Sequence, residues 1–262
     1  MIDSHCHLNF SSISDNFEEI ISNAIKNNIT SILTINTEPD NFLSHYKLIL
    51  NYKSIFISYG LHPENVSKNN IITKDQIIFH SKKDKVIGIG ETGLDFYRSV
   101  EFKKEQYASF ENHIEASIET DLPLIIHQRN SENEIIEILT KYQKIHELKI
   151  VLHCFTGSEN LKKFCLDNNY YISLSGIITF KNASSLRDII KDIPISSLLI
   201  ETDSPFLSPE PFRGKHNQPS FVKHIGEYLS EFYKIPFQTL TLNTDNNFYN
   251  LFNKAIRYSK LS

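Results

Sequence analysis

The chain has 262 residues, of which 40% are hydrophobic and 22% are charged, a composition that supports a packed core and excludes extensive disorder. Its 27 basic and 31 acidic residues give a net charge of −4, which argues against a protein that coats nucleic acid with a broad basic surface. Three cysteines cannot form a disulfide framework, and no signal-like or membrane-spanning segment is evident, so we expect a cytoplasmic protein that does not engage a membrane.

Short runs of β-branched residues alternate with longer helical patterns along the whole chain. We predict strands over 2–7, 31–35, 54–59, 86–91, 122–127, 150–153, 171–174 and 198–203. Helical spacing fills the gaps, beginning with an apolar stripe over 17–25 that follows a capping box formed by Asp15 and Glu18. Ser131 and Glu134 have the same capping spacing before a later helix, and a last helical pattern runs over 248–255.

Alternation of strands and helices on this scale predicts an α/β fold with a parallel sheet and its helices outside. Eight units permit closure into a (β/α)8 TIM barrel, which we expect to span residues 1–262 as a single domain. An open doubly wound sheet is the alternative. That fold normally places a glycine-rich phosphate loop after the first strand, where this chain has His5-Cys6-His7-Leu8.

Polar side chains with ligand chemistry stand at the C-terminal ends of the predicted strands. They are His5, His7, His62, Glu91, His127, His153 and Asp203. These strand ends converge on one face of a (β/α)8 barrel, where active sites lie. The two-residue period of a strand turns both histidines of the first strand to one side, and it predicts that Glu91 shares a side with Ile87 and Ile89.

A lone histidine in a strand is more often part of a hydrogen-bonded core than a metal ligand. Carboxylates gathered among histidines on one face are harder to explain in that way, because burying each charge costs several kcal/mol unless a cation compensates it. Imidazole and carboxylate groups suit Zn or Mn, and carboxylates also suit Mg. The pattern therefore predicts a divalent-metal site at the C-terminal ends of the strands.

The remaining histidines and the cysteines carry no comparable pattern. We expect ordinary surface positions for His45, His80, His113, His146 and His224. We expect small, structural hydrophobes in Cys6, Cys154 and Cys165.

Seven motifs surround the candidate ligands in a fixed order: DSHCH at 3–7, GLHP at 60–63, GETGLDFY at 90–97, PLIIHQR at 123–129, HCFTG at 153–157, ETDSP at 201–205 and RGKHNQP at 213–219. Together they resemble the TatD family of metal-dependent deoxyribonucleases, within the amidohydrolase superfamily. The resemblance covers nearly the whole chain. It implies a (β/α)8 barrel and a hydrolase that cleaves phosphodiester bonds of DNA, with RNA as a second candidate substrate, as an exonuclease using a metal-activated water.

The resemblance also assigns roles to residues. It implies two divalent ions, such as Mg, Mn or Zn, whose ligands are His5, His7 and Asp203 for one ion, His127 and His153 for the other, and Glu91 for both. Glu91 and Asp203 correspond to catalytic groups. Substrate-binding groups correspond to His62, Arg129 and Asn217. The expected partner is nucleic acid, bound weakly and without sequence specificity by a monomer.

Two other functions fit part of this pattern. A metallohydrolase of the same fold that acts on a small-molecule amide, ester or phosphoester needs the same metal site. Arg129, Arg213 and Lys215 near that site favour an anionic substrate. A non-catalytic metal-binding protein is disfavoured because every expected ligand position is retained.

Overall fold

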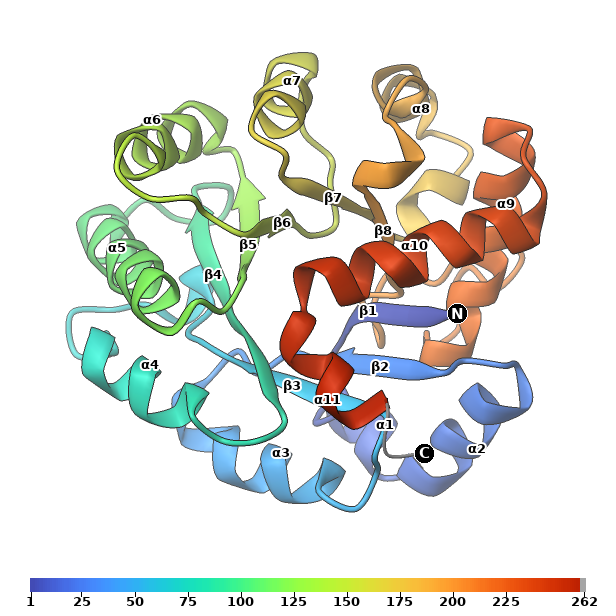
Figure 1. The fold of residues 1–262 in the computed structure, drawn as a ribbon, viewed down its shortest axis with the longest axis horizontal. Coiled ribbons are helices and arrows are strands. Elements are labelled where there is room, and N and C mark those ends of the chain that lie inside the picture. Colours follow the sequence, from blue (N-terminus) through green and yellow to red (C-terminus); the bar gives the residue numbers. More distant parts are fainter. Residues whose placement is uncertain (260–262) are drawn as a thin grey trace.

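The computed structural model describes residues 1–259, and the last three residues of the predicted domain lie outside the described residues. Its eight parallel strands follow one another in sequence order around a ring, as Figure 1 shows. They are β1 (Ile2–Cys6), β2 (Ser31–Thr34), β3 (Ile55–Tyr59), β4 (Val86–Asp95), β5 (Leu124–Arg129), β6 (Ile150–Leu152), β7 (Tyr171–Leu174) and β8 (Leu198–Ile200). The (β/α)8 barrel is thereby confirmed.

Helices surround the ring on its outer side, and the last two lie across one end of it (Figure 1). They are α1 (Ser11–Ser14), α2 (Phe17–Lys26), α3 (Phe42–Ile49), α4 (Lys74–Ser81), α5 (Lys103–Thr120), α6 (Glu132–Gln143), α7 (Glu159–Asp167), α8 (Ser184–Ile190), α9 (Val222–Tyr233), α10 (Phe237–Leu251) and α11 (Ile256–Ser259). No helix in the described part of the chain is long and apolar enough to cross a bilayer.

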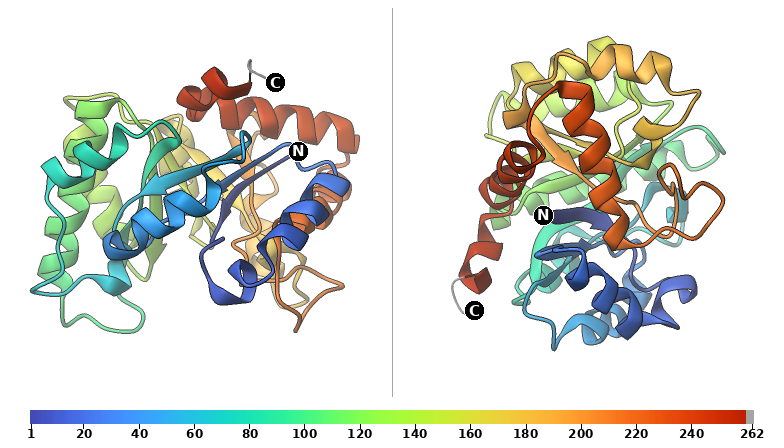
Figure 2. Two further views of the ribbon diagram at one scale, coloured as in Figure 1. Left: turned by 90° about the horizontal axis from the view of Figure 1, so that it is seen from below. Right: turned by 90° about the vertical axis from the view of Figure 1, so that its right-hand side faces the viewer.

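Strands of a barrel are buried on both faces, and two apolar clusters account for this. The outer cluster joins the strands to the surrounding helices. The inner cluster fills the barrel with Ile2, Leu33, Phe56, Ile87, Ile125, Val151 and Leu199. Phe248 and Phe252, at the end of α10, belong to the inner cluster, so this helix seals the N-terminal end of the barrel. Figure 2 shows α10 at one end and the loop after β8 at the other.

The ring closes between β8 and β1 through a few hydrogen bonds rather than a long ladder. The Asp203 amide donates to the His5 carbonyl at 2.9 Å, and the His7 amide donates to the Ser204 carbonyl at 2.7 Å. The Ser4 hydroxyl donates to the Ile200 carbonyl at 2.9 Å. The same bonds that close the barrel therefore hold Asp203 beside the two histidines of β1.

Several predicted boundaries are wrong for local reasons. β4 continues to Asp95, four residues past the predicted end, and β8 stops at Ile200. α2 begins at Phe17 without a side-chain cap, so the predicted capping box is absent. Ser131 does stand before α6, but its hydroxyl donates to the Leu94 carbonyl and accepts no hydrogen bond from the helix. The last helical pattern is interrupted, since α10 ends before a 3₁₀ turn over 253–255.

The histidines expected at the surface divide into two groups. His146 is exposed, and His80 and His224 are half-buried. His45 and His113 are fully buried, which corrects the prediction. Nε2 of His45 lies 2.8 Å from the Thr34 hydroxyl. His113 accepts the Leu61 amide at Nε2 (3.1 Å) and donates from Nδ1 to the Ser109 carbonyl (2.6 Å), so its neutral form satisfies both nitrogens.

Burial lowers the pKa of His113 to about 4, which makes folding stability depend on pH. The unfolded chain protonates this histidine below about pH 6.5, whereas the folded protein keeps it neutral. Its contribution is therefore complete at pH 7 and declines as the pH falls toward 4. We expect the destabilisation caused by His113→Gln to be smaller at pH 5 than at pH 7 by about 2 kcal/mol, measured by urea unfolding. The exposed His146→Gln is the control, and a penalty for His113→Gln that is equal at both pH values would contradict this account.

Candidate metal centre

The predicted ligands converge around one buried carboxylate at the C-terminal end of the barrel. Glu91 is 2% exposed and lies at the middle of the group. Its Oε1 lies 2.7 Å from Nε2 of His153, 3.1 Å from Nδ1 of His127 and 3.2 Å from Nε2 of His62. Its Oε2 lies 3.4 Å from Nε2 of His5 and 4.0 Å from Nε2 of His7. The five imidazoles come from β1, β5 and β6, or the residue directly after the strand, and from the loop after β3, so only the closed barrel brings them together.

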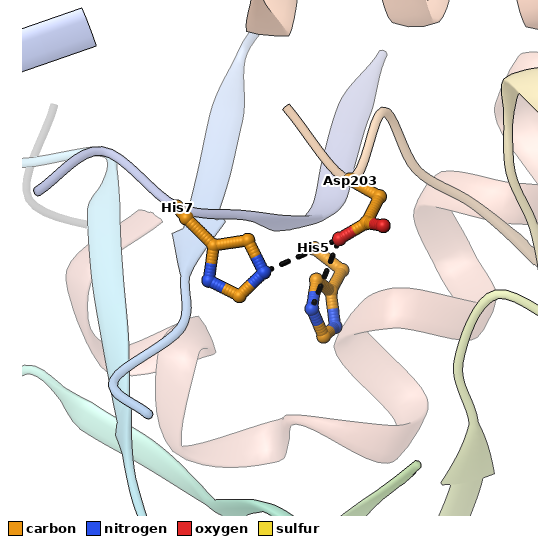
Figure 3. A group of neighbouring side chains, drawn as sticks. All are labelled: His5, His7 and Asp203. Carbon is orange, nitrogen blue, oxygen red and sulfur yellow. Dashed lines mark hydrogen bonds and ion pairs between the residues drawn. The ribbon is translucent and has the colours of Figure 1, made fainter. Parts of the chain in front are cut away.

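A second carboxylate completes the group on the β1 side. Oδ1 of Asp203 lies 3.2 Å from Nε2 of His7 and 3.7 Å from Nε2 of His5. Figure 3 shows both imidazoles directed toward this carboxylate, which the loop after β8 supplies. The prediction that His5 and His7 share a side of β1 agrees with this geometry. Cys6, between them, packs in the outer cluster as expected.

Glu91 reaches this position because β4 is irregular at this point. The register of β4 against β5 shifts between Ile89 and Thr92. Ile87 lies in the inner cluster but Ile89 lies in the outer cluster, so the prediction that both share a side with Glu91 is wrong for Ile89. Gly90 has φ +136, and a Cβ there would lie 2.5 Å from the Ile125 carbonyl oxygen. Glycine is therefore required where β4 bends against β5.

The carboxylates and histidines of the centre stabilise one another's charged forms. Burial alone would raise the pKa of Glu91, but the histidines around it hold that pKa well below its usual range. Burial also opposes the charged form of His153, yet Glu91 and Glu201 raise its pKa well above the usual value. The pKa of Asp203 is lowered in the same way, because His7 and His5 outweigh the effect of burial. The carboxylates are thus ionised and ready to bind cations at neutral pH.

The donor set fits divalent metal ions. A carboxylate offers about four lone-pair sites, too few to bond every nitrogen that faces Glu91. Both ring nitrogens of His5 are buried without a hydrogen-bond partner. Three sets of ligand atoms each lie within 4.8 Å of one another: His5, His7 and Asp203; His5, Glu91 and His153; and His62, Glu91 and His127. Cations in these positions would satisfy the unpaired nitrogens and neutralise the carboxylates.

Two buried carboxylates that the sequence analysis did not assign orient the histidines from behind. Oδ2 of Asp95 accepts from Nε2 of His127 at 2.9 Å, which leaves Nδ1 of that ring facing Glu91. Oε1 of Glu201 lies 3.4 Å from Nδ1 of His153 and accepts the Cys154 amide at 2.6 Å. Carboxylates in this relation to a ligand imidazole fix its tautomer and direction. The motifs contained both residues. Asp95 was not assigned because the strand was predicted to end at Glu91, whereas β4 continues to Asp95.

The three predicted substrate-binding residues occupy different surroundings. His62 belongs with the candidate ligands through its contact with Glu91. Arg129 is exposed, and its guanidinium lies 3.7 Å from the centroid of the Tyr97 ring, beside a cleft of about 500 Å³. Asn217 is buried, and its amide donates to the carbonyls of Thr202 and Phe206. The structure therefore gives Asn217 a role in holding the loop after β8, and its contact with substrate stays a prediction.

Comparisons with known proteins identify the family and agree with the fold. A family profile described as "TatD related DNase" matches residues 2–253. A metal-dependent hydrolase of Buchnera aphidicola subsp. Acyrthosiphon pisum is 43% identical, over 97% of this chain and 99% of the relative. The metal-dependent hydrolase YabD of Bacillus subtilis is 34% identical, over 96% and 98%. The crystal structure of YJJV, a TatD homologue from Escherichia coli K12, superposes with a TM-score of 0.87 at 30% identity, covering 97% of this chain and 98% of that one.

Proposed function

Because the chain belongs to the TatD-related DNase family and is a metal-dependent hydrolase of that family, we propose that it hydrolyses phosphodiester bonds of DNA at the centre around Glu91. The observation that carries the proposal is the group of five imidazoles and two carboxylates beside an exposed arginine. Glu91 faces His5 and His7 with one oxygen and the other three histidines with the second, which is the arrangement expected of a carboxylate shared by two ions.

The residues of the centre would have two roles, holding the metal ions and orienting the attacking water. Divalent ions in such a centre would neutralise phosphate oxygens and make water more acidic. His5, His7 and Asp203 would hold one ion. His127 and His153, whose Nδ1 and Nε2 atoms lie 3.3 Å apart, would hold the other, with His62 close enough to assist, and Glu91 would serve both ions. Asp203 is ionised and less enclosed than Glu91, so it is the group we expect to orient the attacking water and accept its proton.

Arg129 is placed to bind the substrate phosphate. It stands two residues after His127 on β5, so both side chains leave the strand on the same side. Within residues 1–259 no carboxylate forms an ion pair with Arg129, although its charge helps to lower the pKa of Asp95, and this supports a substrate-binding role over a surface salt bridge. Stacking on Tyr97 leaves the edge of the guanidinium free to donate to two phosphate oxygens.

Arg129→Ala should lower kcat/KM for DNA about ten- to a hundredfold, since each lost charge-assisted hydrogen bond is worth roughly 1.5–3 kcal/mol. The bound metal should stay the same, because Arg129 contacts no candidate ligand. Steady-state kinetics and metal analysis on the same preparation measure both quantities. Lys163→Ala, which removes an exposed cation on α7, is the control. An unchanged kcat/KM for Arg129→Ala would remove this residue from the substrate site.

One panel of substrates tests the proposed function. Single-stranded DNA, duplex DNA, RNA and small amide, ester and phosphoester compounds are each offered with Mg, Mn, Zn or Co. We expect DNA to be cleaved from its ends. Binding should be weak and independent of sequence, because the net charge of −4 leaves only local cations to hold the backbone. Preferred hydrolysis of a neutral small molecule would instead favour the metallohydrolase alternative.

A further inference from the structure

Two phenylalanines form an exposed aromatic corner beside the metal centre. Phe10 follows β1 and is 37% exposed, and Phe206 lies in the loop after β8 and is 47% exposed. Their ring centroids are 5.4 Å apart with an angle of 83° between the ring planes. Although these residues are 196 positions apart in the chain, the closure of β8 onto β1 brings them together.

The corner is joined directly to a candidate ligand. The His7 ring lies 5.5 Å from that of Phe10 and 6.1 Å from that of Phe206, centroid to centroid. Nε2 of the same histidine contacts Asp203, as Figure 3 shows. A phosphate held in front of His7 and Asp203 is therefore bordered by the two phenyl rings on this side, whereas Arg129 and Tyr97 border the centre on the side of β5.

We propose that Phe10 and Phe206 form a platform on which the nucleobase adjacent to the cleaved phosphate stacks, an inference that rests on the proposed function. In a nucleotide the base is one sugar ring away from its phosphate, which matches a stacking surface that touches a candidate metal ligand, His7. Rings at 83° allow a flat base to lie against one face while its edge meets the other ring. Stacking uses the face that every base has, so this platform would bind DNA ends without reading sequence.

The test uses dinucleotides with one phosphodiester bond, offered intact, without the 5′ base, or without the 3′ base. In the parent protein, removing one of the two bases should lower kcat/KM roughly five- to a hundredfold, since stacking on an aromatic ring is worth about 1–3 kcal/mol per base. Phe10→Ala/Phe206→Ala should lose a similar factor with the intact dinucleotide. With the dinucleotide that lacks the stacked base, kcat/KM of the double variant should be close to that of the parent. The platform and the base form one contact, so removing either one already removes it.

Matched variants separate stacking from folding. Phe206→Tyr keeps an aromatic face and should preserve the preference for the intact dinucleotide over the base-free one. Phe206→Leu keeps apolar bulk and should lose most of that preference. Phe79→Ala removes a 66% exposed ring on α4, away from the centre, and should leave the cost of base removal unchanged. The platform would be overturned if the double variant lost the same factor in kcat/KM on all three dinucleotides. It would also be overturned if removing either base left kcat/KM of the parent unchanged.

Binding provides a readout that does not depend on catalysis. Dissociation constants of the three dinucleotides, measured by NMR titration of parent and double variant, should show the same pattern as kcat/KM. If the parent hydrolyses none of the dinucleotides and no DNA, the proposed function fails, and the binding data alone then decide the platform. Equal dissociation constants for intact and base-free dinucleotides would contradict it.

Discussion

Glu91→Gln should lower kcat/KM for DNA at least a hundredfold while the barrel stays folded. The substitution keeps the size of the side chain but removes the charge that five imidazoles face. Changing groups that merely support a metal ligand costs about 10- to 100-fold in metal affinity or activity, so losing the shared carboxylate should cost at least as much. The amide also presents an NH₂ group to histidines that need an acceptor or a cation.

Three measurements separate the possible causes of that loss. Metal titration by calorimetry should show weaker binding of at least one ion, and circular dichroism should show an unchanged fold. Burial lowers the pKa of His153, whereas Glu91 and Glu201 raise it well above the usual value, so in metal-free Glu91→Gln that pKa should fall. Glu119→Gln, an exposed carboxylate on α5, is the control. Tight binding of two ions together with normal turnover would mean that Glu91 is not the shared ligand.

The fold was predictable because each strand and each helix leaves a local pattern, and eight units leave few ways to close a sheet. Strand ends were less accurate, because the factors that decide them are not local. β4 continues past Glu91 since its later residues pair with β5, with Thr92 opposite Ile126 and Asp95 opposite Arg129. β8 stops early because Asp203 bonds the backbone of β1 instead of continuing along β7.

The candidate ligands were identified because histidines and carboxylates at strand ends are unusual in a core and fall on one face of a barrel. Their supporting groups were missed because support depends on distant partners. Glu201 becomes part of the centre only through His153 and the Cys154 amide, 47 or more positions away. His113 is buried because it caps the Leu61 amide, 52 positions earlier in the chain, a contact that no helical pattern reveals.

Treatment with EDTA should abolish hydrolysis of DNA, and adding back one divalent metal should restore it. The physical reason is that two carboxylates lie among five imidazoles, and that both ring nitrogens of His5 have no hydrogen-bond partner, which bound cations would satisfy. Removing the metal should also lower folding stability. An ion present at a hundred times its dissociation constant contributes about 2.7 kcal/mol, so urea unfolding should shift to lower concentration after chelation.

The two halves of the centre should respond separately to mutation. Asp203→Asn should weaken the ion beside His5 and His7, and His127→Gln the ion beside His153, so each variant should keep one of the two binding steps seen when metal is titrated into the parent. Loss of both steps in either variant would mean that the ligands form one indivisible site. Chelated protein that still cleaves DNA at the full rate would show that the chemistry needs no metal, and it would contradict the function proposed for the Glu91 centre.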